Sequence, residues 1–223
     1  MKYEIWGDVC PALTVKLDKG ESIYTQQGGM SWMTDQIAIN TSIQDKTSFR
    51  DYLKRNDETA AQYKALDDDQ EITISATRAG KILEFDIKEG HSVIGRKSHL
   101  LCIEESVKAS TITQSYNKHL PNSSGYNLQI YTGEGKVFME LCGSIKEIEL
   151  KEGQRIVAES GNLVAWDSTV TVTEQFQRNF KSMLLAGEGT LMSVVEGPGK
   201  IWLQTAPISE ISKRIIPFIE DVK

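Results

Sequence analysis

One short pattern occurs three times along this chain of 223 residues, around Gly20, Gly90 and Gly153. In each copy, apolar residues stand five and three positions before the glycine, and further apolar residues stand three and ten positions after it. These offsets hold without gaps. The apolar residues ten positions after the glycines are Met30, Leu100 and Leu163.

The pattern predicts a β-hairpin in each copy. Apolar residues at alternate positions place one face of a strand in a core. Two polar residues followed by glycine suit a turn that ends in the left-handed conformation, which glycine adopts without a Cβ clash. Three copies at fixed offsets indicate duplication, with the glycines, Met30 and Leu163 as framework positions.

A second recurring element is Gly-Lys followed by an apolar pair, at Gly80, Gly135 and Gly199. It predicts a turn that enters a strand. Together the two elements divide the chain into β units at 1–76, 77–134 and 135–198, with a closing strand and tail at 199–223. We expect a mainly β protein of three similar units that form one compact domain.

Two segments interrupt the β pattern and predict short inserted helices in the first and third units. Residues 47–66 place Phe49, Tyr52, Tyr63 and Leu66 at near-helical spacing, and residues 174–185 do the same with their apolar residues. Pro217 predicts that any helix in the C-terminal segment 208–222 is short or broken.

Composition excludes several classes of protein. The net charge of −6 and the pI near 5.2 disfavour binding to nucleic acid and to anionic membranes. No apolar run is long enough to span a bilayer, and the first residues do not form a secretory signal. Three widely spaced cysteines, Cys10, Cys102 and Cys142, argue against a disulfide framework and favour the cytoplasm.

Four segments together resemble a known family. They are "GGMSWM", "GNLVAW", "FKSMLLAGEG" and "GPGKIWLQT", and the likeness extends over essentially the whole chain. The family is the bacterial and mitochondrial one named after altered inheritance of mitochondria, member twenty-four. The segment from Ile43 to Gln70 departs most, because it is longer and more charged than the family pattern.

The resemblance implies duplicated β-sandwich or double-stranded β-helix-like units, similar to the trp RNA-binding attenuation protein, and assembly into rings or trimers. It implies no enzymatic activity and no catalytic residue, since the family has no catalytic motif to match. Its mitochondrial members are linked to inner-membrane organisation, a role that need not extend to this chain.

A metal site is the first candidate for chemistry, because double-stranded β-helices often hold one. The histidines are His91, His99 and His119, and Glu104 and Glu105 follow the second of them. The closely spaced His-x-His pair of metal-binding cupins is missing, so surface histidines are the favoured interpretation. We predict no metal ion and no other cofactor.

Nucleophilic and phosphate-binding sites are also weakly indicated. Cys102 lies in an alternating apolar stretch, and Cys142 precedes Gly143 and Ser144, yet no neighbouring cation would activate either thiol. The segments "GEGK" and "GPGK" lack the Walker spacing and lead into strands, which makes them turns. No Gly-x-Ser-x-Gly motif occurs.

Binding functions are the remaining possibilities. Lys81, Lys136 and Lys200 recur once per unit and would form a basic rim in an RNA-binding ring, although turn lysines are the simpler interpretation. Unpaired sheet edges must be covered. Trp32, Trp166 and Trp202 are expected to lie in the core, and contacts between subunits are the alternative role for them.

We therefore expect a non-enzymatic, self-assembling scaffold or binding protein that forms a homo-oligomer, with a trimer favoured by the family resemblance. The alternative is a cupin-like metal-dependent or small-molecule enzyme, and a weaker alternative is an RNA-binding ring.

Overall fold

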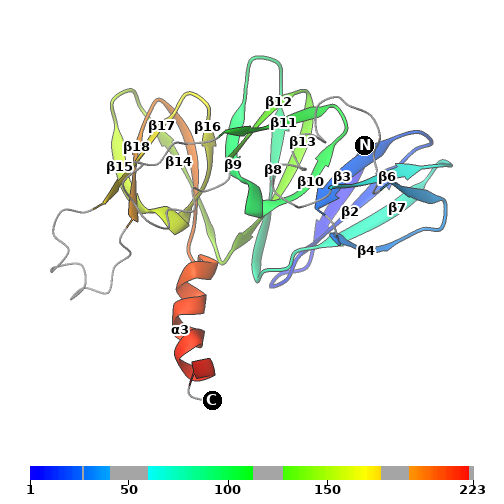
Figure 1. The fold of residues 1–223 in the computed structure, drawn as a ribbon. Helices are drawn as coiled ribbons and strands as arrows, with labels where there is room; N and C mark the ends of the chain where they lie inside the picture. Colours follow the sequence, from blue (N-terminus) through cyan, green and yellow to red (C-terminus); the bar gives the residue numbers. More distant parts are fainter. Residues whose placement is uncertain (27, 41–59, 113–127, 177–190, 221–223) are drawn as a thin grey trace. The chain divides into compact units, whose positions relative to one another are not determined.

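The protein is described by a computed structural model that covers residues 1–26, 28–40, 60–112, 128–176 and 191–220 (Figure 1). These residues form two compact units. Unit 1 contains the described residues up to 112 and from 128 to 141, and unit 2 contains those from 142 to 220. Strands dominate both units, so the predicted mainly β class is confirmed.

Unit 1 contains thirteen strands, counting β13, whose last residue belongs to unit 2. Their bounds are β1 Lys2–Trp6, β2 Ala12–Leu17, β3 Ser22–Gln26, β4 Met30–Met33, β5 Ile37–Asn40, β6 Ala60–Ala65, β7 Gln70–Ser75, β8 Gly80–Ile87, β9 Val93–Arg96, β10 Leu100–Glu104, β11 Val107–Ile112, β12 Leu128–Gly133 and β13 Gly135–Cys142. A 3-10 helix, Lys97–His99, joins β9 to β10.

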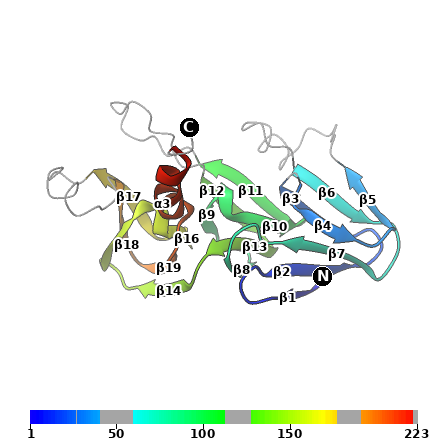
Figure 2. The same ribbon diagram turned by 90° about the horizontal axis from the view of Figure 1, so that it is seen from below.

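The strands of unit 1 form antiparallel sheets. One sheet has the order β1-β2-β7-β4, a second has the order β5-β6-β3-β10-β13-β8, and β11, β12 and β9 are adjacent in that order. Figure 2 shows β1, β2 and β7 side by side. Alternate apolar residues of β2 and β7, including the fully buried Leu13, Val15, Ile72 and Ile74, pack into a core with Ile23 of β3.

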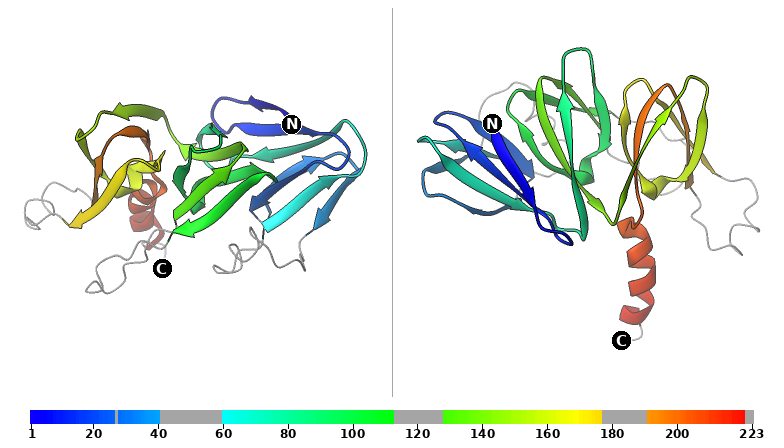
Figure 3. Two further views of the ribbon diagram at one scale, coloured as in Figure 1. Left: turned by 90° about the horizontal axis from the view of Figure 1, so that it is seen from above. Right: turned by 180° about the vertical axis from the view of Figure 1, so that it is seen from behind.

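Unit 2 contains six further strands and one α-helix. Their bounds are β14 Ile145–Leu150, β15 Arg155–Glu159, β16 Leu163–Asp167, β17 Thr171–Phe176, β18 Leu191–Glu196, β19 Gly199–Gln204 and α3 Ile208–Glu220, with a 3-10 helix at Ser160–Asn162. One group of strands has the order β16-β19-β14 and the other has the order β15-β18-β17. The helix extends away from these strands (Figure 3).

The first predicted inserted helix is wrong where the structure describes it. Residues 60–65 form β6, in which Ala61, Tyr63 and Ala65 are buried while Gln62 and Lys64 are not. The alternation of period two outweighs the three-residue spacing, because β6 pairs with both β3 and β5. Residues 47–59 of the prediction lie outside the described residues.

The second predicted helix, at 174–185, is also wrong in its described part. Residues 174–176 end β17, which pairs along its whole length with β18. The residues from 177 to 185 lie outside the described residues.

The C-terminal segment is a continuous helix of 13 residues rather than a short or broken one. Pro217 removes only the hydrogen bond to the carbonyl of Lys213. Lys213 is exposed, so a water molecule can donate to its carbonyl oxygen instead. This C-terminal helix, α3, is the one α-helix among the residues that the structure describes.

Candidate functional site

Two groups of strands, β5-β6-β3 and β10-β13-β8, join edge to edge within one sheet of unit 1, where β3 pairs with β10. The pairing is antiparallel and places Thr25 opposite Cys102, Tyr24 opposite Ile103 and Ile23 opposite Glu104. Three of these side chains, Ile23, Cys102 and Ile103, have no exposed surface. A pairing of strand edges thus creates a fully buried contact between two parts of this chain.

A side-chain hydrogen bond closes one end of this joint. The hydroxyl of Ser22 donates to Oε2 of Glu105 across 2.6 Å, and Ser22 is itself buried. Charged acceptors make such bonds about twice as strong as neutral ones. Ser22 also accepts a hydrogen bond of 3.1 Å from the amide of Gln62 on β6. The bond to Glu105 therefore fixes the register of β10 against β3.

Two other strands keep one edge without a partner in the described part of the chain. β4 pairs with β7 only, and β15 pairs with β18 only. Each carries a large apolar side chain that is mostly exposed: Trp32 on β4 at 54% and Val157 on β15 at 57%. Unpaired edges with exposed apolar residues are where further chains add to a sheet.

A third apolar surface lies on α3. Ile208, Ile211, Ile215 and Ile216 are each between 40% and 55% exposed. Their spacing puts Ile208, Ile211 and Ile215 on one side of the helix. Lys213, on the polar side, pairs with Glu210 and lies 3.7 Å from Glu159 at the end of β15. Sequence reasoning missed this stripe because Pro217 argued against a long helix.

The most developed polar cluster surrounds His99 in unit 1. Its Nδ1 lies 2.8 Å from the backbone oxygen of Glu140 and 3.1 Å from Nη1 of Arg78. Because a carbonyl oxygen can only accept, the neutral ring carries its hydrogen on Nδ1. Burial is the main cause that lowers the pKa of His99 to about 4; the hydrogen bond to the Glu140 carbonyl raises this pKa, and the charges of Arg78 and Arg96 lower it.

The carboxylate of Glu140 is held by the neighbours of that histidine. It accepts hydrogen bonds of 2.6 Å from the backbone N–H of Thr77 and 2.9 Å from the Thr77 hydroxyl, and Nε of Arg78 lies 3.6 Å away. Glu140 is only 6% exposed. These contacts satisfy a buried charge, so the cluster stabilises the end of β13 rather than opening toward a substrate.

The residues that the sequence offered as metal ligands lie in different environments. His99 is buried, His91 is exposed in the turn after β8, and His119 lies outside the described residues. The carboxylates of Glu104 and Glu105 accept the structural hydrogen bonds from Lys136 N–H and Ser22. Throughout the described ranges, no three His, Cys, Asp or Glu side chains are grouped to hold a metal ion.

The cysteines differ in exposure. Cys102 is fully buried, and burial raises the pKa of its thiol far above the ordinary value, which keeps it protonated. Cys142 is also buried, and its backbone N–H donates to Oε1 of Gln204 across 2.9 Å. Cys10 is exposed. A protonated buried thiol packs as a small apolar group.

The recurring lysines do not share one environment. Lys136 contacts Glu84, and this hydrogen bond raises the pKa of Lys136. Lys200 lies 2.7 Å from Glu147, and that hydrogen bond likewise raises the pKa of Lys200. Lys81 is exposed on β8. The charges of Lys136 and Lys200 are balanced by carboxylates, which weakens the case for a basic rim on these residues.

The tryptophans divide between core and surface. Trp166 and Trp202 are buried at 4% and 6% exposure, and the indole N–H of Trp202 donates to Glu147 across 3.0 Å. Trp32 is exposed, with its ring 6.1 Å from that of Trp6. Core packing therefore describes two of the three, and Trp32 alone has the exposure that a contact surface requires.

Two pockets are lined by described residues. One of about 340 Å³ in unit 1 is lined by residues that include Glu21, Glu104 and Glu105, each of which already accepts a hydrogen bond. The other, of about 780 Å³, lies beside Leu150 and Gly199 in unit 2. Neither lining contains a histidine, a cysteine or an aromatic residue.

The fold and these surfaces define a mainly β protein in which groups of strands join through their edges. The chain belongs to the family described as "Mitochondrial biogenesis AIM24", whose model matches residues 3–206. The match stops before α3.

The chain is also similar to two proteins of Streptococcus pyogenes. The chain is 24% identical over 219 residues to an uncharacterised protein of serotype M6, covering 93% of this chain and 87% of that protein. It is also similar to a crystal structure of a protein from the same species, with a TM-score of 0.80, 19% identity, and coverage of 97% of this chain and 99% of the other. The second likeness shows the fold alone. No helix among the described residues is long and apolar enough to cross a lipid bilayer.

Proposed function

We propose that the chain is a non-enzymatic, self-assembling scaffold or binding protein built of three similar β modules. The modules are β2 to β7, β8 to β13 and β14 to β19. This division keeps the first predicted unit and moves the later boundaries to residues 142–145 and to the end of β19 at 204.

The strand pairing supports the three modules. In each, the sixth strand lies between the first and the third, as in β2-β7-β4, β8-β13-β10 and β14-β19-β16. In each, the fifth strand lies between the second and the fourth, as in β3-β6-β5, β9-β12-β11 and β15-β18-β17. A shared order of six strands is hard to reach without a shared origin.

The register irregularities support the same division. Where the third strand pairs with the sixth, the register shifts between Met30 and Trp32, between Leu100 and Cys102, and between Leu163 and Ala165. The first residue of each pair is the apolar residue ten positions after the framework glycine. Bulges are designed features of a family's strands, so their recurrence favours duplication.

One backbone hydrogen bond recurs with different side chains. The N–H of Glu71 donates to Oγ1 of Thr34 at 3.1 Å, that of Lys136 to Oε2 of Glu104 at 2.6 Å, and that of Lys200 to Oδ2 of Asp167 at 2.8 Å. Each donor is the second residue of the sixth strand.

Alignment of the three proposed modules changes which residue of the first module corresponds to Gly135 and Gly199. Gly135 and Gly199 open β13 and β19 with φ values of 141° and 136°. Their counterpart in this proposal is Gln70 at the start of β7. Gly80 opens β8, the first strand of its module, so its Gly-Lys sequence matches the other two in letters rather than in place.

The joint between β3 and β10 is the observation that carries the functional proposal. It joins the second strand of the first module to the third strand of the second module. Modules of this kind therefore associate through strand edges, and edges left unpaired invite the same association between copies. Rings or trimers, on a fold similar to the trp RNA-binding attenuation protein, are the arrangements that the family resemblance implies.

Light scattering of the purified full chain tests the proposal. We expect a mass that is a whole multiple of 24.9 kDa and that persists on dilution into the low micromolar range. A mass of one chain at high concentration would contradict self-assembly. Elemental analysis of the same sample distinguishes the cupin-like alternative, which requires stoichiometric metal.

A further inference from the structure

We propose that β15 of one copy pairs, antiparallel, with β4 of a second copy, with Ala158 opposite Trp32, Val157 opposite Met33 and Ile156 opposite Thr34. This inference rests on the proposed function, because it names the surfaces through which copies associate.

The β3–β10 joint supplies the register. Thr25 and Ala158 both lie five residues after their framework glycine, and Cys102 and Trp32 both lie twelve residues after theirs. Thr25 stands opposite Cys102 in the joint. Transferring that pairing to the unpaired edges places Ala158 opposite Trp32. β15 is the second strand of its module, as β3 is, and β4 is the third strand of its module, as β10 is.

Residues on the edges of β4 and β15 are more exposed than their counterparts in the joint between β3 and β10, as expected if a second copy covers these edges. Ile23 and Cys102 have no exposed surface in the joint. Their counterparts are exposed to solvent, Ile156 partly and Trp32 at 54%. Val157, the neighbour of Ile156, is 57% exposed. A soluble chain leaves such residues on an open sheet edge at the risk of uncontrolled addition, so a dedicated partner strand is the simplest cover.

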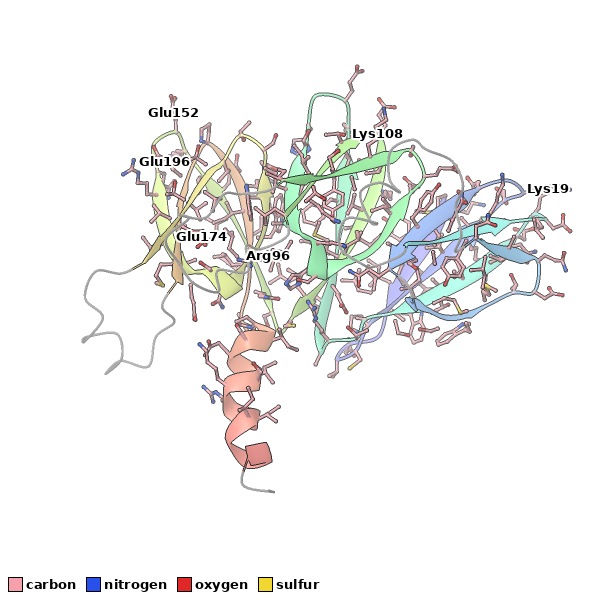
Figure 4. All side chains as sticks on the ribbon, viewed as in Figure 1. Lys19, Arg96, Lys108, Glu152, Glu174 and Glu196 are labelled. Carbon is pink, nitrogen blue, oxygen red and sulfur yellow. The ribbon has the colours of Figure 1, made fainter. Side chains whose placement is uncertain are left out.

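Charge complementarity selects the same register. The position of Ser22 corresponds to Arg155, and the position of Glu105 corresponds to Asp35. Across the joint, the hydroxyl of Ser22 donates to Glu105 over 2.6 Å. Across the proposed pairing, a guanidinium would face a carboxylate at the same place. Arg155 keeps its contact of 2.7 Å with Glu196 (labelled in Figure 4), since a guanidinium has five donors.

The proposed contact joins two different surfaces and is therefore heterologous. Each copy would offer β15 to one neighbour and β4 to another, so assembly gives either a closed ring or a filament. A two-fold dimer through β4 alone or through β15 alone is not compatible with it.

Disulfide trapping tests the register in the full chain. The starting protein carries Cys10→Ser, because Cys10 is exposed while Cys102 and Cys142 are buried. Adding Trp32→Cys and Ala158→Cys together should give, on mild oxidation, covalent species of two or more chains that revert to single chains on reduction. Directly opposed residues in antiparallel strands fall within the Cα separation that a disulfide requires.

Three controls fix the interpretation. Trp32→Cys alone and Ala158→Cys alone should each stay as single chains, because the proposed contact never places two copies of the same residue together. Trp32→Cys with Ile156→Cys should cross-link at least tenfold more slowly, because diagonal neighbours lie about 7–8 Å apart.

The outcomes separate this inference from the proposed function. A multi-chain mass by light scattering without a Trp32→Cys/Ala158→Cys disulfide overturns the register and leaves self-assembly standing. A disulfide formed within one chain, or equal trapping of the Ile156→Cys control, also overturns it. A single-chain mass for the unmodified protein overturns both.

Discussion

The hydroxyl of Ser22 and the carboxylate of Glu105 face each other across two strand edges, 2.6 Å apart, and close one end of the joint between β3 and β10. They are separated by 83 positions in the chain. In the proposed pairing, Arg155 and Asp35 take the corresponding places on the unpaired edges of β15 and β4, so we expect copies of the chain to recognise each other through this charge pair.

Charge reversal tests that statement. Asp35→Arg and Arg155→Asp should each shift the assembly toward single chains, because each places like charges opposite one another, and the double variant should restore the original mass. Sedimentation velocity at low salt measures the change, since exposed charges are screened at high salt. Lys108→Asp, at an exposed residue of β11, is the matched control and should leave the mass unchanged. Failure of the double variant to recover would count against the pairing.

The buried histidine predicts a pH dependence of stability. The folded protein holds His99 neutral, with a pKa of about 4, whereas the pKa of an unperturbed histidine side chain is about 6.5. Below pH 6.5 the unfolded chain binds a proton that the folded chain does not, so stability is lost as the pH falls toward 4. The difference corresponds to about 3 kcal/mol in the free energy of unfolding.

Urea unfolding between pH 7.5 and 4.5 measures this dependence. His99→Gln should flatten the slope over the range below pH 6.5, and His91→Gln, at an exposed turn residue, should leave it as it is. An identical slope in His99→Gln and the unmodified protein would show that other groups cause the dependence.

Buried and exposed ion pairs should differ in their contribution to stability. Glu140→Ala leaves Arg78 and the N–H of Thr77 without their acceptor in a buried site, and we expect a loss of about 3 kcal/mol. Glu71→Ala removes a partner of Lys16 at 2.8 Å on the surface and should cost much less than Glu140→Ala. Denaturant titration compares them, and equal losses would contradict the structural role of the Glu140 cluster.

Two glycines with positive φ should respond differently to alanine. At Gly153 an added Cβ meets open space, so the cost comes only from φ of 71° and should be about 1–2 kcal/mol. At Gly199 the Cβ would lie 2.6 Å from Oγ1 of Thr169 and 2.8 Å from Cγ2 of Val170, and the loss should be larger. Thermal unfolding ranks the two variants, and a milder effect at Gly199 would contradict the packing described around β19.

The exposed stripe on α3 also predicts a measurable surface property. Ile211→Glu with Ile215→Glu should shorten retention on a hydrophobic-interaction column without lowering the melting temperature, because both side chains are at least 40% exposed. Unchanged retention would mean that another surface covers the stripe in the assembled protein. Ile74→Glu, at a residue with no exposed surface, should instead prevent folding.

The sequence predicts the β class because period-two patterns are local, and it misreads segments where two periods coincide. Residues 60–65 fit both a helix and a strand, and only pairing with β3 and β5 decides between them. Histidine burial depends on contacts such as that between His99 and Glu140, which are distant in the chain, so the sequence could not separate His99 from His91.

The candidate site was partly accessible to prediction. The glycine offsets align Ser22 with Arg155 and Glu105 with Asp35. The sequence does not indicate, however, that Ser22 and Glu105 meet across the joint between β3 and β10. Trp32 could be named from its position, yet its exposure, unlike that of Trp166, becomes apparent only when the packing is known.

The recurring bond to the start of the central strands has a consequence for how such chains diverge. A hydroxyl at Thr34 and carboxylates at Glu104 and Asp167 accept the same kind of backbone donor. In the three proposed modules, the requirement at these positions is therefore an oxygen lone pair at a given point in space, and any of several residues satisfies it. A common origin of the modules would accordingly be recorded as a pattern of acceptors rather than as residue identities.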